Sequence, residues 1–199
     1  CFFVSPFDDA AILTFDGYGE RTSTLFADGS GTTIRDLGRV EYPHSLGSLY
    51  AAVTAYLGFK PNNAEGKIMA LASYGTPSLT ADFRKLVHLL PGGRFELDLS
   101  YFDFYLERGR RVSPKFIEQF GPPRIAESGA PDPRHLDIAT AVQTVFEETL
   151  DHLLAHTHRQ TERRAVCLAG GAALNCVANG RTLPRSEFRD SNIQPAAGD

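Results

Sequence analysis

The feature that most constrains the fold is a long amphipathic helix followed at once by a buried strand and a glycine pair. From His135, apolar residues recur every three or four positions, as in a helix with one face in the core. The segment 163–171 (RRAVCLAGG) is nearly continuously apolar, as in strands buried on both faces. A helix is predicted after Gly171 and a strand at 192–199 (NIQPAAGD). This succession predicts half of a layered α/β domain.

The first 42 residues predict a meander of three strands. The expected strands are Ala10–Asp16, Thr22–Gly29 and Gly31–Tyr42, and turns are expected at the Asp-Gly pairs 16–17 and 28–29. Hairpins in succession imply antiparallel pairing. Together with the later strands, they predict a mixed sheet with helices.

Two helices and an irregular segment are predicted between these parts. Ser45 is placed to cap a helix through Phe59, and a shorter helix is expected over 64–75. Pro91–Pro133 is punctuated by glycine and proline and is rich in aromatic residues. We interpret it as an insertion suited to a lid or a partner surface, or equally as a surface excursion with its own aromatic mini-core.

Composition excludes several classes of protein. The 199 residues carry a formal charge of −4 with no basic block, so a nucleic-acid partner is not expected. There is neither an apolar run of the roughly 18 residues that span a bilayer nor a signal segment, so a cytoplasmic protein without a membrane partner is expected. Cys1, Cys167 and Cys176 lack CxxC spacing, and the last two are predicted to be buried thiols.

The pair Gly170-Gly171 is the first candidate binding site. Glycines between a strand and a helix let a ligand approach the backbone, and the first helical turn favours a phosphate. Asn175 and Asn179 are four residues apart, so both are expected on one helical face, available to a ribose, a base or a hydroxyl. The alternative is a turn that only permits tight helix–strand packing, and the residues alone leave both readings open.

The second candidate is DGYGE, with Asp16, Gly17, Gly19 and Glu20 at the tip of the first hairpin. A carboxylate beside flexible residues can hold a hydrated metal ion, or the loop amides can meet a phosphate. An ordinary hairpin turn is the alternative.

His44 and Lys67, both beside predicted helix starts, are the candidate catalytic residues. The alternative is structural, because a lone histidine there is usually a capping or packing residue and a lone lysine is usually solvated. His152 and His156 have helical zinc-site spacing, but HLLAH lacks the glutamate of HExxH, so a metal site is not predicted there.

Together these segments resemble carbamoyltransferases of the NodU/CmcH type, and specifically their Kae1-like domain. The matching blocks are FFVSPFDDAAILTFDGYGE, YPHSLGSLYAAVTAYLGFKPNNAEGKIMALASYG, DIATAVQTVFEETLDHLL, CLAGGAALNCVANGR and QPAAGD, in family order from Phe2 to Asp199. Pro91–Pro133 is the least family-like part.

The resemblance implies an actin-like ATPase fold of the ribonuclease H-like α/β class. It also implies that carbamoyl phosphate and ATP give a carbamoyl-adenylate in a separate YrdC-like domain, from which the carbamoyl group passes to a hydroxylated small-molecule acceptor. Gly170, Gly171 and Asn175 are then expected at the adenylate, and His44 is a candidate base. Iron(II) or a similar divalent ion is expected on two histidines and an aspartate, and Asp199 matches the aspartate.

The departures from the family pattern predict a partial domain. The family's HHxxHAA motif precedes the segment that begins here at Cys1, and the YrdC-like domain is not in the sequence. We therefore expect a fragment that is inactive alone and that can form a homo-oligomer. The alternatives are a noncatalytic nucleotide-binding module of the actin-like superfamily and a degenerate remnant.

Overall fold

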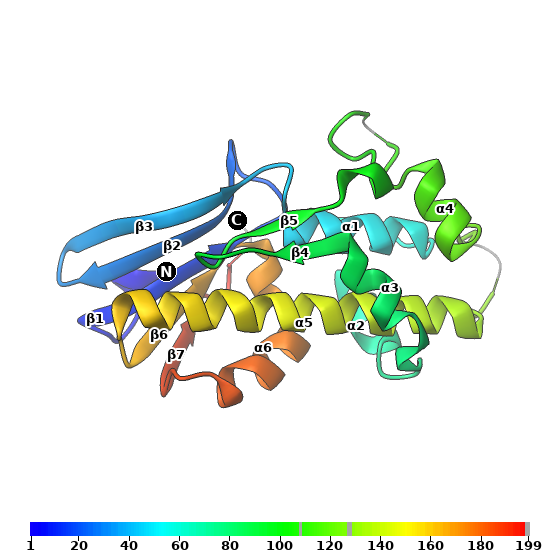
Figure 1. Cartoon of the computed structure of the whole chain (residues 1–199). Helices are drawn as coiled ribbons and strands as arrows, with labels where there is room; N and C mark the ends of the chain where they lie inside the picture. Colours follow the sequence, from blue (N-terminus) through cyan, green and yellow to red (C-terminus); the bar gives the residue numbers. More distant parts are fainter. Residues whose placement is uncertain (108, 127–128, 198–199) are drawn as a thin grey trace. The chain divides into compact units, whose positions relative to one another are not determined.

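The computed structural model describes residues 1–107, 109–126 and 129–197, and it divides into two compact units (Figure 1). The first unit contains Cys1–Gly47, Leu89–Glu96 and Glu147–Asp199, and the second contains Ser48–His88 and Leu97–Phe146. Over the described ranges, none of the helices combines the length and the apolar character that crossing a membrane requires.

A five-stranded mixed sheet forms the first unit, in the order β3-β2-β1-β6-β7. The strands are β1 (Asp9–Phe15), β2 (Thr22–Ser30), β3 (Thr33–Glu41), β6 (Ala165–Ala169) and β7 (Asp190–Ile193). The first three form the predicted antiparallel meander, whereas β6 runs parallel to both β1 and β7. The predicted α/β class with a mixed sheet is confirmed, and the architecture is consistent with a partial actin-like, ribonuclease H-like fold.

Two local predictions are wrong. The pair Asp28-Gly29 lies inside β2 rather than in a turn, because each residue has a tertiary role: the carboxylate of Asp28 binds Arg163, and the missing side chain of Gly29 makes room for the ring of Phe2. The last predicted strand, 192–199, is displaced, since β7 ends at Ile193.

The two faces of this sheet have different coverings. Helix α5 (Pro133–Thr161), which begins two residues before the predicted start, places His156 against Phe26 of β2, with ring centroids 5.2 Å apart. On the other face, Phe2 packs in a buried cluster with five small or apolar residues, namely Ala10, Ile12, Ala27, Ala165 and Cys167. Strand β6 is buried along Ala165–Leu168, as its apolar run predicts.

The histidines of HLLAH contact a β-hairpin. Strands β4 (Val87–Leu89) and β5 (Phe95–Leu97) form a two-stranded sheet. The Nε2 atom of His152 lies 3.0 Å from the carbonyl oxygen of Leu90, and His156 fills the space where a Gly93 side chain would lie. Among the described residues, no three histidine, cysteine, aspartate or glutamate side chains group as a metal site.

An aromatic core forms the second unit. Its further helices are α1 (Leu46–Tyr56, counted here from Ser48), α2 (Glu65–Leu71), α3 (Thr80–Phe83) and α4 (Pro114–Phe120). Phe116 contacts Tyr56, Phe83 and Phe120, with ring centroids 4.6–6.1 Å apart. The segment 91–133 therefore contributes to a core that it shares with α1 and α3. Its status as an insertion stays a prediction.

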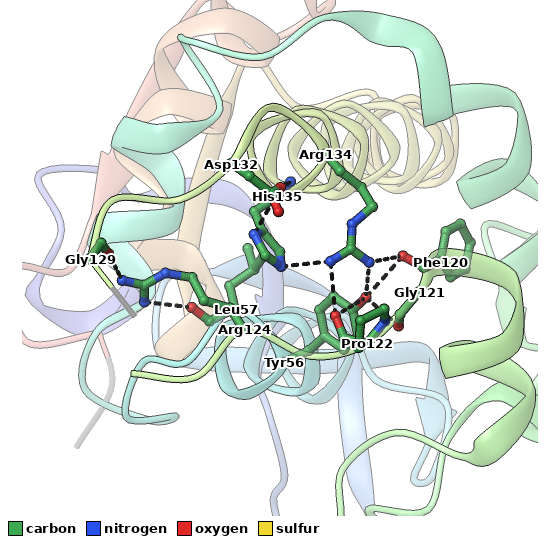
Figure 2. A network of polar contacts seen from close by, with 10 residues as sticks. All are labelled: Tyr56, Leu57, Phe120, Gly121, Pro122, Arg124, Gly129, Asp132, Arg134 and His135. Atoms are coloured by element: carbon green, nitrogen blue, oxygen red, sulfur yellow. Dashed lines mark hydrogen bonds and ion pairs between the residues drawn. The ribbon is translucent and has the colours of Figure 1, made fainter. Parts of the chain in front are cut away.

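Two arginines donate hydrogen bonds to carbonyl oxygens at, and directly after, the C-terminal ends of two helices of this unit (Figure 2). Arg134 donates to the carbonyl oxygens of Phe120, the last residue of α4, and of Pro122, the latter at 3.0 Å. Arg124 donates to the carbonyl oxygen of Leu57, directly after α1, at 3.2 Å. The last carbonyl groups of a helix have no hydrogen-bond donors within the helix. At these two helix ends the guanidinium groups are the donors.

The same network favours the neutral imidazole of His135 (Figure 2). Its Nε2 atom lies 3.0 Å from Nη2 of Arg134, which can only donate, so Nε2 must accept. Its Nδ1 atom lies 2.9 Å from Asp132. Burial lowers the pKa of His135, which favours the neutral ring that this contact requires.

Arg163 lies two residues before β6 and forms ion pairs with β1 and β2 of the meander. Its Nε lies 2.7 Å from the carboxylate of Asp28, and its Nη1 lies 3.1 Å from that of Asp9. The hydrogen bond from Arg163 lowers the pKa of Asp28, whose side chain is only 13% exposed.

We expect Asp28→Asn to lower the free energy of unfolding by about 1–3 kcal/mol near pH 7, as for a hydrogen bond to a charged group. Because the hydrogen bond from Arg163 lowers the folded-state pKa of Asp28 below its unfolded-state pKa, the contribution is present above the unfolded-state pKa and is lost as the pH falls through the folded-state pKa. Urea unfolding followed by circular dichroism at about pH 7 and about pH 3 measures this difference. Asp82→Asn, at an exposed ion pair, is the control, and a penalty independent of pH would contradict the assignment.

Candidate functional site

The parallel pairing of β1 with β6 brings two predicted sites to one edge of the sheet. The register runs from Ala11 opposite Val166 to Thr14 opposite Ala169, so the carboxyl ends of both strands lie side by side. The Asp16 loop follows one strand, and Gly170 follows the other. The carboxyl end of such strands is where open α/β sheets bind ligands.

Gly170 makes a backbone contact that no other residue type permits. Its φ is +95°, and a Cβ atom built there would lie 2.2 Å from the carbonyl oxygen of Phe15. Its N–H donates to the carbonyl oxygen of Ala197 at 2.9 Å. Gly170 therefore permits a close approach to the end of β1, and its amide is engaged within the chain; the role of the turn at a ligand stays a prediction.

The Asp16 loop is anchored by the start of α1. The hydroxyl of Ser45 shares its proton between the carbonyl oxygens of Asp16 and Gly17, at 2.7 and 2.6 Å. A Cβ atom at Gly47 would lie 2.4 Å from the amide nitrogen of Gly17, so the two backbones touch. The N–H of Gly17 donates to the carboxylate of Asp16 at 2.6 Å, which orients that side chain.

These two backbone segments border one hollow of about 430 Å³. It is lined by residues of β1, the Asp16 loop, β2, β3, the glycine turn and the end of the described chain. These residues are Thr14, Asp16, Gly19, Thr22, Ser23, Leu25, Asp36, Arg39, Gly170 and Ala197. Its volume lies in the range of small-molecule pockets. The structure thus brings together Asp16, Gly19 and Gly170, as one site requires.

Asp36 and Arg39 were not anticipated as site residues from the sequence. They lie on β3, two strands from β1 and three from β6 in the sheet, and their charges alone are typical of a solvated strand edge. Only the pairing register of the sheet turns them toward the hollow.

The predicted helix after Gly171 is replaced by two shorter elements. A 3₁₀ helix covers Gly171–Leu174, and α6 covers Cys176–Thr182. Asn175 caps α6 by accepting from the N–H of Ala178 at 3.0 Å, and Asn179 donates to the carbonyl oxygen of Ala173 at 2.6 Å. The two asparagines therefore do not share an exposed helical face: both are buried and bind local backbone. A contact between Asn175 and an adenylate stays a prediction.

The remaining predicted residues lie in different surroundings. His44 is half-buried just after β3, and its carbonyl oxygen accepts from the hydroxyl of Ser23, which lines the hollow. Glu20 is exposed on the Asp16 loop. Lys67 is exposed on α2 of the second unit, with its ammonium 5.4 Å from the ring centroid of Phe59. Asp199 lies outside the described residues.

The two internal cysteines differ in their environment. Cys167 is buried as predicted, and burial raises the pKa of its thiol. Cys176 is exposed, so its predicted burial is wrong: as the first residue of α6, it points away from the packed side of a short helix.

The family comparison agrees with this architecture. The family model described as carbamoyltransferase N-terminus matches residues 1–199. The chain is 42% identical over its full length to the uncharacterized protein sll1178 of Synechocystis, covering 32% of that protein. It is 34% identical to the nodulation protein NolNO of Sinorhizobium fredii and 32% identical to NolO of Bradyrhizobium diazoefficiens, again over its full length, covering 27% and 34% of them.

The chain therefore belongs to the NodU-type carbamoyltransferase family and corresponds to the family's N-terminal region. It spans about a third of the length of the curated relatives it matches.

We expect Gly170→Ala to lower the free energy of unfolding by at least about 2 kcal/mol, since it combines a left-handed φ with a backbone clash. Gly180→Ala in α6 is the matched control, because a Cβ atom there meets nothing within 4 Å. That variant should gain up to about 1 kcal/mol from helix propensity. Equal urea midpoints for the two variants would contradict the backbone contact.

Proposed function

We propose that this chain is part of an ATP-dependent O-carbamoyltransferase. In this proposal carbamoyl phosphate, ATP and water give a carbamoyl-adenylate, phosphate and pyrophosphate in a YrdC-like partner domain. The carbamoyl group then passes to a hydroxyl of a small-molecule or sugar acceptor. The observation that carries the proposal is the single hollow bordered by both the Asp16 loop and the Gly170 turn. Family membership supports the carbamoyl chemistry.

The nucleotide part of the proposal rests on the position of the hollow. It lies where parallel strands end, a region in which backbone amides and loop side chains favour phosphate-bearing ligands. Thr14 and Thr22 line it and carry hydroxyl groups, and Asp16 contributes a carboxylate oriented by the amide of Gly17.

The described residues fit a divalent ion only in part. The hollow contains two carboxylates, those of Asp16 and Asp36, and the described part of the chain holds no cluster of three ligands. Iron(II) would therefore need ligands from elsewhere, such as Asp199 and the two histidines of the family pattern. When bound, such an ion would polarise the carbamoyl carbonyl.

The transfer itself is a balanced acyl substitution. The acceptor oxygen bonds to the carbamoyl carbon, the bond from that carbon to the phosphoryl oxygen breaks, and AMP leaves with the electron pair. The hydroxyl proton passes to a base. His44 is the candidate base in the first unit because it lies in a family-like block; its carbonyl oxygen accepts from Ser23, which lines the hollow.

The test uses the intact protein with iron(II), ATP, carbamoyl phosphate and a panel of hydroxylated acceptors, assayed by mass spectrometry. We expect a carbamoylated product from the wild type and a loss of at least about 100-fold in Asp16→Asn, the scale of a lost electrostatic group in an active site. Glu96→Gln, at an exposed position on β5, should keep wild-type turnover. Nucleotide binding without turnover in the wild type would favour the noncatalytic module instead.

Asp199→Ala separates the two half-reactions. We expect it to lower the metal content and abolish transfer while pyrophosphate release, the readout of adenylate formation, continues, because adenylation is assigned to the partner domain. Metal analysis and a pyrophosphate assay on the intact protein measure both. Unchanged turnover would remove Asp199 from the metal site.

A further inference from the structure

The floor of the hollow is a row of three residues across the meander. Thr14 of β1 lies opposite Leu25 of β2, and Leu25 lies opposite Arg39 of β3. Directly opposed residues in antiparallel strands point to the same face. This is also the face on which Phe2 covers Ile12 and its neighbours, so the row continues that face past the end of the covered part.

A bulge in β3 places Asp36 on the same face as Arg39. The register changes from Gly38 opposite Phe26 to Asp36 opposite Ala27, so Leu37 is an extra residue. In a regular strand, residues three apart point to opposite faces. Because Leu37 is an extra residue, Asp36 and Arg39 instead point to the same face. The carboxylate of Asp36 then accepts from the guanidinium of Arg39 and from the N–H of Gly38, at 2.9 Å for the latter.

The charges of the hollow give Arg39 a distinct role. Among the described residues that line it, Arg39 supplies the only positive charge, whereas Asp16 and Asp36 are negative. The side chains of Arg39 and Asp36 are 50% and 44% exposed, so their ion pair is screened by water and weak. A guanidinium in such a pair is available to a stronger, bidentate anion such as a phosphate.

We propose that Arg39 binds a phosphate group of the ligand in the hollow, exchanging the carboxylate of Asp36 for phosphate oxygens. This inference rests on the proposed nucleotide site and names the residue that recognises its anionic part. Without Arg39, a phosphate in this hollow would face two carboxylates and no cation from the described lining. Two sources share this chemistry, the nucleotide and carbamoyl phosphate.

Titration calorimetry on the intact protein with magnesium tests the assignment, using adenosine, AMP, ATP and carbamoyl phosphate as separate ligands. We expect Arg39→Gln to weaken the binding of AMP, the phosphate-bearing part of the adenylate, by about tenfold or more, equivalent to about 1.4 kcal/mol. Adenosine binding, and the binding of ATP to the YrdC-like partner domain, should be unchanged. If carbamoyl phosphate is the source, its binding alone should weaken. Arg39→Lys should retain part of the affinity, since it keeps the charge but not the planar fork.

Two further variants separate ligand binding from structure. Asp36→Asn releases Arg39 and removes one repulsive charge, so it should tighten phosphate binding, an effect that a merely structural ion pair would not give. Arg35→Gln, on the same strand but outside the hollow lining, should bind like the wild type. Unchanged urea midpoints would show that all variants fold.

Two results would overturn the inference. Wild-type affinity for every phosphate ligand in Arg39→Gln would exclude Arg39 and leave the proposed function standing. Absence of nucleotide and carbamoyl phosphate binding in the wild type would overturn both the proposed function and the role of Arg39.

Discussion

The backbone contact between Gly170 and Phe15 is the constraint on which the first unit depends. Parallel pairing of β1 and β6 forces the chain segments that leave these strands to run side by side. At this point a side chain at residue 170 would overlap the carbonyl oxygen of Phe15. The glycine removes this overlap, and the two predicted ligand segments consequently border one hollow instead of two separate turns.

The sheet face that Phe2 covers contributes both to stability and to the candidate binding site. At one end, the ring of Phe2 lies over Gly29 and closes a buried cluster. At the other end, the bulge in β3 turns a charged pair onto the same face, where apolar cover ends and the hollow begins. The covered half contributes apolar burial, and the open half keeps the polar groups that a phosphate-bearing ligand needs.

The second unit is organised by different interactions. An aromatic cluster around Phe116 supplies its core, and Arg134 and Arg124 bind carbonyl groups at helix ends (Figure 2). The contact with Arg134 also requires a neutral His135. The segment 91–133 thus contributes packed and hydrogen-bonded structure, while the candidate site lies in the first unit.

The sequence by itself determined the meander, the long helix, the buried strand and the glycine turn, because apolar periodicity and glycine placement act over short stretches of chain. It also determined the family. Only the tertiary structure decided that Asp28-Gly29 stays in a strand, that Asn175 and Asn179 turn inward, and that Arg39 reaches the hollow. Those outcomes depend on partners distant in sequence, such as Arg163 for Asp28, and on a one-residue change of register, which local patterns do not encode.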